Sequence, residues 1–167
     1  MKFYMHKDGF IYSGDMTDGA REATQEEISA HLNPVLSLKE QKADKLREID
    51  AWTASAITRG FISAATGTNH TYDSETTDQD NIKTMYLAAQ SPDFATHPVY
   101  QGKIPLRGIP DGQTEKVILQ HTAEQMQKVI DDMALHIGTC KQKCWQLQEA
   151  VKAATTKEEL EPITWPE

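Results

Sequence analysis

The stretch that decides the fold runs from residue 126 to residue 154 and reads MQKVIDDMALHIGTCKQKCWQLQEAVKAA. Its apolar residues recur alternately four and three positions apart, which is the heptad period of a coiled-coil seam or of the central helix of a bundle. A helix of about 30 residues is roughly 45 Å long, and so narrow an apolar stripe needs a partner to cover it. The predicted seam consists of Met126, Ile130, Met133, Ile137, Cys140, Cys144, Leu147 and Val151.

The partner of this seam is either a second helix of the same chain or another copy of the chain. A second long helix is predicted from Leu36 or Leu38 to Arg59, because its apolar residues share one stripe while its charged residues face water. Gly60 then provides a natural C-terminal cap. The predicted fold is therefore α+β but mainly α: a long helical hairpin or coiled-coil-like bundle with small β-hairpins, occupying residues 35–167.

A small N-terminal attachment is predicted over residues 1–34. Its elements are two strands, at 2–6 and 10–13, and a helix that begins after Thr24 and ends at Asn33–Pro34. Glu27 stands three residues after Thr24, which is the spacing of a capping box. Proline ends the helix because the residue before it avoids the helical region.

Two more hairpins are predicted between the long helices. Strands at 61–64 and 68–72 flank Thr66-Gly67, and strands at 103–106 and 114–119 are joined across Pro110-Asp111-Gly112. The segment 91–110 is rich in Pro and Gly and is otherwise expected to be irregular.

The composition of the chain argues against several kinds of partner. The net charge is −8, from 25 acidic and 17 basic residues, and no block of Lys and Arg follows a phosphate backbone. Neither nucleic acid nor membrane is therefore expected as a partner. The first residues lack an apolar signal region and no stretch reaches the length of a membrane span, so we expect a soluble protein made in the cytosol. With 38% apolar and 7% aromatic residues, the core is lean, which favours association.

Two clusters contain residue types that bind metals. His136, Cys140 and Cys144 share a helix face and are zinc ligands by type, but a site needs a fourth ligand or converging copies. Packing of reduced thiols is the preferred interpretation. A second, acidic cluster lies ahead of and inside the first turn of a predicted helix, where the helix dipole favours it, and it lacks the glycine and final glutamate of a calcium loop. It consists of Asp73, Glu75, Asp78 and Asp80. No metal and no cofactor is expected.

No catalytic motif stands out. The sequence contains no nucleophile elbow, zincin motif, P-loop or dinucleotide-binding fingerprint, so we do not expect an enzyme. Trp52, on the stripe of the first long helix, is expected in the core. Trp165 is expected to dock back on the bundle and fix the terminus, whereas an exposed Trp165 would be a candidate anchor for a partner.

Several motifs together carry a family resemblance. Residues 45–52, KLREIDAW, lead into Arg59-Gly60-Phe61, and the long helix ends in AATTKEELEPITWP at 153–166. With these motifs, the segment from about residue 40 to 166 resembles a domain of unknown function that is common in bacteriophage tail-gene clusters. The hairpin motif Asp8–Tyr12 and the helix start Thr24–Ile28 resemble the opening of phage tail-fibre assembly proteins.

The resemblance implies a non-enzymatic bacteriophage tail protein, structural or tail-fibre-associated, that mediates protein–protein assembly. It would be made in the host cytoplasm and located in the virion tail, with phage tail or tail-fibre proteins as its partners. A seam shared between copies favours a homo-oligomer, and the three-fold symmetry common in tail fibres favours a trimer. The alternative is a tail-fibre assembly chaperone that binds the fibre and is absent from the mature virion.

Overall fold

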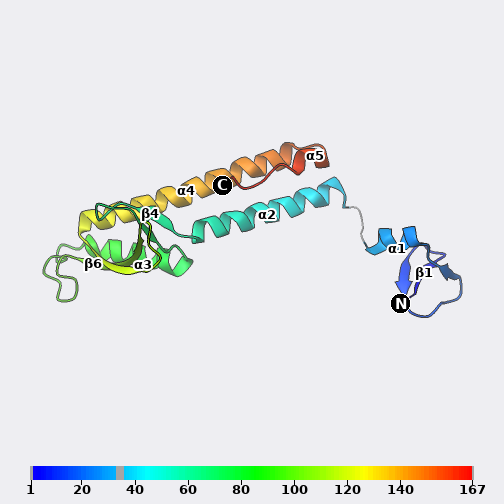
Figure 1. Cartoon of the computed structure of the whole chain (residues 1–167), viewed down its shortest axis with the longest axis horizontal. Coiled ribbons are helices and arrows are strands. Elements are labelled where there is room, and N and C mark those ends of the chain that lie inside the picture. The colour runs from blue at the N-terminus through cyan, green and yellow to red at the C-terminus, as the bar shows by residue number, and fades with distance from the viewer. Residues whose placement is uncertain (1, 33–35, 167) are drawn as a thin grey trace. The chain divides into compact units, whose positions relative to one another are not determined.

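The structure, a computed structural model, describes residues 2–32 and 36–166 of the chain. It divides into two compact units, Met1–Gln41 and Lys42–Glu167, whose elements are labelled in Figure 1. The predicted helix stop at Asn33–Pro34, and with it the predicted division after residue 34, lies outside the described residues. Among the helices that are described, none has the length and hydropathy needed to cross a bilayer.

The first unit is a three-stranded antiparallel sheet followed by one helix. The predicted hairpin is confirmed, with Phe3 opposite Ser13. A third strand, which the sequence did not indicate, pairs with the other edge of the first and places Arg21 opposite Met5. Three residues are too few to show an alternating pattern. The elements are β1 (Phe3–His6), β2 (Ile11–Ser13), β3 (Ala20–Glu22) and α1 (Gln25–Leu32), in the strand order β2–β1–β3.

The predicted capping box at the start of α1 is confirmed. The Thr24 N–H donates to Glu27 Oε2 at 2.9 Å, and the Glu27 N–H donates to Thr24 Oγ1 at 3.2 Å. The Arg21 guanidinium also donates to Glu27 Oε2 at 2.8 Å. This bond is the main reason that the pKa of Glu27 falls to about 2. Hydrogen bonds from Arg21 of β3 to Glu27 of α1 therefore hold these two elements of the first unit together.

The second unit contains a four-stranded antiparallel sheet that joins the two predicted hairpins. Both hairpins form, but the strand predicted at 103–106 continues to Pro110, through residues that were expected to be irregular or to form the turn. The strands β5 and β6 pair so that Tyr72 lies opposite Gly108. The strand order is β4–β5–β6–β7. The elements are α2 (Leu38–Thr58), β4 (Phe61–Ser63), β5 (His70–Tyr72), α3 (Thr76–Ala89), β6 (Ile104–Pro110), β7 (Val117–His121), α4 (Ala123–Ala153) and α5 (Lys157–Leu160).

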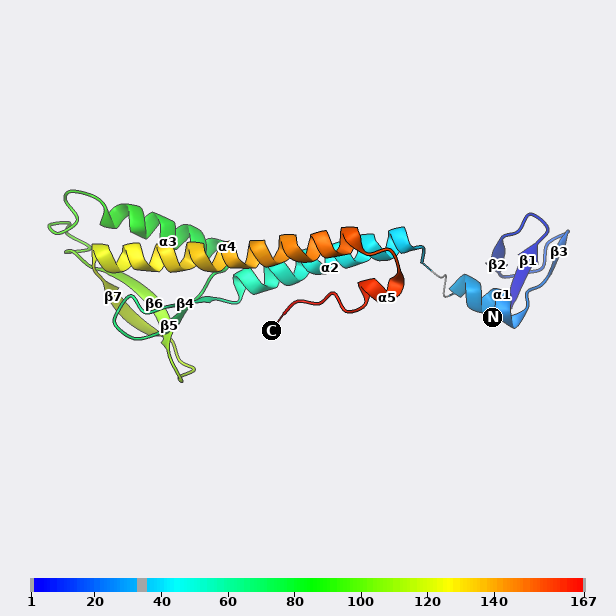
Figure 2. The same cartoon turned by 90° about the horizontal axis from the view of Figure 1, so that it is seen from above.

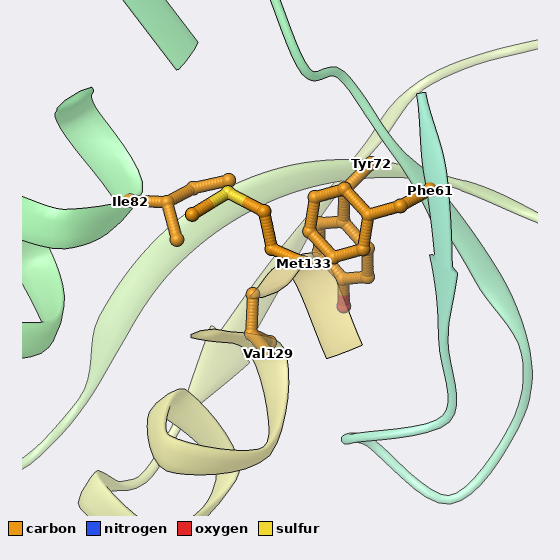
Figure 3. Packing of buried hydrophobic residues seen from close by; sticks show 5 residues of the cluster. All are labelled: Phe61, Tyr72, Ile82, Val129 and Met133. Carbon is orange, nitrogen blue, oxygen red and sulfur yellow. The ribbon is translucent and has the colours of Figure 1, made fainter. Parts of the chain in front are cut away.

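The core of the second unit lies where α3 and the sheet both pack on the N-terminal half of α4 (Figure 2). Figure 3 shows its main cluster, in which side chains from β4, β5, α3 and α4 converge. The rings of Phe61 and Tyr72 stack with their centroids 5.6 Å apart. The buried members are Phe61, Tyr72, Ile82, Val129 and Met133, and a second cluster consists of Ala89, Phe94, Ile104 and Met126.

The predicted mainly α architecture, a long helical hairpin or coiled-coil-like bundle, is wrong. The chain is a mixed α+β fold: the part that the structure describes is 48% helix and 17% strand and holds five helices and two antiparallel sheets. The reason lies on α4, where Val129, outside the predicted seam, is fully buried between Met126 and Met133. This stripe is wider than a coiled-coil seam and is typical of a helix that covers a globular core. It faces a sheet and α3.

The C-terminal half of α4 lies beside α2, and polar contacts join the two helices. The Gln148 amide donates to Asp50 Oδ1 at 2.9 Å, and Lys42 Nζ donates to the Lys152 carbonyl at 2.9 Å. The buried side chains of α2 are Ile49 and Thr53. After α5 the chain turns back alongside both helices (Figures 1 and 2) and buries Ile163. The candidate site lies between α2, α4 and the segment that follows α5.

Candidate functional site

The predicted seam residues lie on the inward face of α4. Met126, Met133, Cys140, Cys144 and Val151 are buried within the chain, whereas Ile130, Ile137 and Leu147 are half-buried. Ile130 and Ile137 pack against the main core cluster. A role for these residues in joining copies of the chain stays a prediction.

The possible zinc ligands on α4 have other partners. The His136 Nε2–H donates to the Ala56 carbonyl at 3.1 Å, and Cys144 Sγ lies 3.9 Å from Asp50 Oδ1. Cys140 Sγ is 4.0 Å from His136 Nε2, and burial raises the pKa of the Cys140 thiol, partly offset by Lys143. Both cysteines are free thiols. Within residues 2–32 and 36–166, no group of three or more His, Cys, Asp or Glu is placed to hold a metal ion.

Three members of the acidic cluster at the start of α3 have local partners. Asp73 accepts from Lys116 Nζ at 2.6 Å and Asp80 from Lys83 Nζ at 3.2 Å. The Asp78 carboxylate accepts from the Glu75 N–H at 3.1 Å at the start of α3. These carboxylates therefore serve local pairing and helix capping.

A groove of about 670 Å³ lies between α2, α4 and the C-terminal tail. We call it the tryptophan groove, after the two tryptophans that line it. The α2 side supplies Trp52, Ser55, Ala56, Arg59 and Gly60; the α4 side supplies His136, Thr139, Cys140 and Lys143; and the tail supplies Trp165 and Pro166. Its volume falls within the range of about 300–1,000 Å³ that is usual for ligand sites.

Both tryptophans are half-buried and each has a lysine over its ring. Lys45 Nζ is 5.5 Å from the Trp52 ring centroid, and Lys143 Nζ is 5.9 Å from that of Trp165. Trp165 therefore docks back toward the helices as the sequence predicted, but it does so as one wall of the groove. Trp52 lines the groove instead of the core, which corrects the prediction for that residue. Arg59 was not predicted as a site residue, because no feature of the sequence distinguishes it from an ordinary arginine at the end of a helix.

The charge of the tryptophan groove differs from that of the chain. Arg59 and Lys143 line it, and the described part of its lining includes no carboxylate. Arg59 follows the last residue of α2 and is exposed. Neither cation makes an ion pair with any residue that the structure describes. The groove thus combines aromatic surface with unneutralised positive charge.

A second cavity, of about 420 Å³, lies between α3 and the strands β5 and β6. Its charged residues have both signs, with Asp73 and Asp78 near Arg107. Asp73 and Asp78 already have partners in the chain and are less free to bind a ligand. This cavity is therefore a weaker candidate for a binding site than the tryptophan groove.

A buried polar pair is formed by Tyr72 of β5 and His121 of β7. The Tyr72 hydroxyl donates to His121 Nε2 at 2.8 Å, because the Nδ1 of His121 faces two carbonyls, those of Leu119 at 3.1 Å and Ile104 at 3.3 Å. Burial raises the pKa of Tyr72 to about 12 and lowers the pKa of His121. Both side chains are almost inaccessible to solvent, so the pair contributes to the stability of the folded second unit.

Acid is expected to destabilise the second unit through His121. Because the folded-state pKa of His121 is lowered, the unfolded chain takes up the proton first as the pH falls. The stability is fully present above the ordinary pKa of about 6.5 and is lost below it, by at most about 1.4 kcal/mol per pH unit for one proton. Urea unfolding at pH 7.5 and at pH 5.5 measures the loss. His121→Gln should flatten this dependence, and an unchanged slope in that variant would contradict the assignment.

Comparison with known proteins gives one match. A family model described as a domain of unknown function, DUF4376, matches residues 40–164. No curated protein sequence and no solved structure matches the chain. The match spans the second unit, so the tryptophan groove lies within it apart from Trp165 and Pro166.

Proposed function

The chain belongs to the family of the domain of unknown function DUF4376, and from that premise we propose that it is a non-enzymatic bacteriophage tail protein that mediates protein–protein assembly. Its partners on this proposal are tail or tail-fibre proteins, and its place is the virion tail. The support from sequence is the resemblance of residues 40–166 and of the N-terminal hairpin to phage tail proteins. The support from the structure is the aromatic and cationic lining of the tryptophan groove.

The observation that carries the proposal is the tryptophan groove, an aromatic and cationic recess. Tryptophan and arginine are the residues most enriched among the energetic centres of protein interfaces. The second unit also exposes several large apolar side chains that its core does not use. Those more than 60% exposed are Ile62, Leu87, Val99, Ile118, Leu135 and Trp145.

A homo-oligomer, with a trimer favoured by the symmetry of tail fibres, remains part of the proposal. The heptad residues that motivated it are buried or half-buried within one chain. Contacts between copies would therefore use exposed residues such as Leu135 and Trp145, which lie on the outer side of α4 at 69% and 61% exposure.

The second candidate function is that of an assembly chaperone. It is favoured by the first unit, whose hairpin and Thr24–Ile28 helix start resemble tail-fibre assembly proteins. Such a chaperone would bind the fibre during folding and then leave it.

Mass spectrometry of purified phage particles, with the crude lysate alongside and the major capsid protein as an internal standard, tests the proposal. We expect peptides of this chain in the particle at a fixed stoichiometry, with a copy number divisible by three for a trimer. Abundance in the lysate with absence from particles would instead favour the chaperone. Absence from particles together with no association with fibre proteins in the lysate would overturn the phage assignment.

A further inference from the structure

We infer that the tryptophan groove binds an acidic segment of a protein partner. Carboxylates of the segment would meet Arg59 and Lys143, and an apolar side chain beside them would lie against Trp52 or Trp165. The inference rests on the proposed function, because it names the chemistry of the partner that an assembly protein would hold at this site.

The first argument is charge complementarity. In a chain of net charge −8, two cations line the groove, and none of the described residues contributes a carboxylate to its lining. Most other cations of the second unit are neutralised by a nearby carboxylate: these are Lys45, Arg47, Lys83, Lys116, Lys128, Lys152 and Lys157. Within residues 2–32 and 36–166, no carboxylate forms an ion pair with Arg59 or Lys143, so these two cations can pair with an anion of a partner, and complementary charge favours such a partner.

The second argument is the chemistry of the anion. Arg59 lies at the C-terminal end of α2, where the helix dipole places partial negative charge. The backbone N–H of Gly60 next to it is already bonded to Ser74 Oγ at 3.0 Å. A free phosphate, which favours helix N-termini and unpaired backbone N–H groups, is therefore poorly suited. The negative helix end opposes the single charge of a carboxylate less than the larger charge of a phosphate, and a carboxylate can still accept two hydrogen bonds from the Arg59 guanidinium.

The third argument is the size and lining of the groove. A volume of about 670 Å³ accommodates a few side chains of a peptide segment. The two indole rings offer apolar surface beside the cations, from α2 and from the tail respectively. Aromatic side chains supply large contact area with few rotatable bonds to immobilise, so an acidic segment with an apolar residue would use both features at once.

The test uses two matched pools of randomised peptides of about ten residues and the immobilised full chain. One pool carries Asp or Glu at about four positions, and the other carries Asn or Gln at the same positions. Mass spectrometry counts the peptides that are retained. We expect the acidic pool to be retained about tenfold more than the amide pool, as two charge-assisted contacts allow.

Charge-matched variants locate the binding. Arg59→Glu combined with Lys143→Glu should abolish the preference for the acidic pool. The control, Arg47→Glu combined with Lys141→Glu, makes the same change in net charge at exposed positions of the same two helices outside the groove, and it should keep the preference. Circular dichroism checks that both double variants are folded.

The tryptophans give a second, independent readout. Trp165→Ala should weaken retention of the acidic pool, whereas Trp145→Ala, an exposed tryptophan outside the groove, should not. If free glutamate displaces the peptides at equal concentration, the groove is a small-anion site and the inference is wrong.

Equal retention of the two pools, or an unchanged preference in the groove variant, would also overturn the inference. Either result, obtained while the chain is stoichiometric in phage particles, leaves the assembly function standing and removes only the acidic partner. Groove-dependent binding of acidic peptides by a chain absent from particles and from fibre complexes would sink the phage function instead.

Discussion

Met133→Ala is expected to lower the free energy of unfolding of the second unit by about 2–5 kcal/mol, the usual cost of truncating a buried methionine. Met133 is 2% exposed and lies in the main core cluster against Phe61, Tyr72 and Ile82. Removing its side chain would leave a cavity at the place where α3, α4 and the sheet meet (Figure 3). Urea unfolding, monitored by circular dichroism at neutral pH, measures the loss.

The matched control for this variant is Leu135→Ala. Leu135 is two residues further along the same helix but 69% exposed, so its truncation should change stability by no more than about 0.5 kcal/mol. Equal losses in the two variants would mean that α4 buries a different face from the one described. A large effect of Leu135→Ala at high protein concentration alone would instead indicate a contact between copies.

Gly60→Ala is expected to cost about 2 kcal/mol or more, because two penalties act together. Gly60 has φ +109°, a conformation that side chains disfavour, at the turn from α2 into β4. A Cβ at this position would lie 2.8 Å from the carbonyl oxygen of Tyr72 and 3.2 Å from Thr71 Cγ2. Either β5 or the end of α2 must then shift. Thermal unfolding of the purified variant provides the measurement.

Gly138→Ala, in contrast, is expected to raise the stability of the chain. Gly138 lies inside α4, and apart from its neighbours and the backbone of its own helix, no heavy atom of the described residues comes within 4 Å of a Cβ built at this position. Alanine should therefore stabilise the helix by about 0.5–1 kcal/mol through its better helix propensity. A loss of stability in Gly138→Ala, or none in Gly60→Ala, would contradict the backbone geometry described for these positions.

Local structure was largely predictable because its causes lie within a few residues of each other. The Thr24–Glu27 and Thr122–Gln125 pairs cap α1 and α4 through contacts three residues apart. The three hairpins follow from turn residues between short apolar runs. In each case the interacting groups are neighbours in sequence, so no knowledge of the tertiary arrangement was needed.

The core and the groove were harder to predict because they depend on distant contacts. Tyr72 and His121 are 49 residues apart in sequence, and their hydrogen bond exists only because β6 brings their strands into one sheet. The spacing of apolar residues on α4 shows that one face of the helix is covered. The same spacing is expected whether a helix or a sheet covers that face. The heptad interpretation therefore considered only helices as partners, missed the sheet that covers the N-terminal half of α4, and omitted Val129, which belongs to the core cluster formed there.

By itself, the sequence determined the helices α2 and α4, the three hairpins, the helix caps and the acidic charge of the chain. Only the tertiary structure decided that two hairpins join through β5 and β6, that this sheet and α3 cover α4, and that Trp52, Lys143 and Trp165 line one groove. The physical reason is that helix and turn propensities act over short distances along the chain. The choice of which apolar faces meet depends instead on burying them together, and that is a property of the whole folded unit.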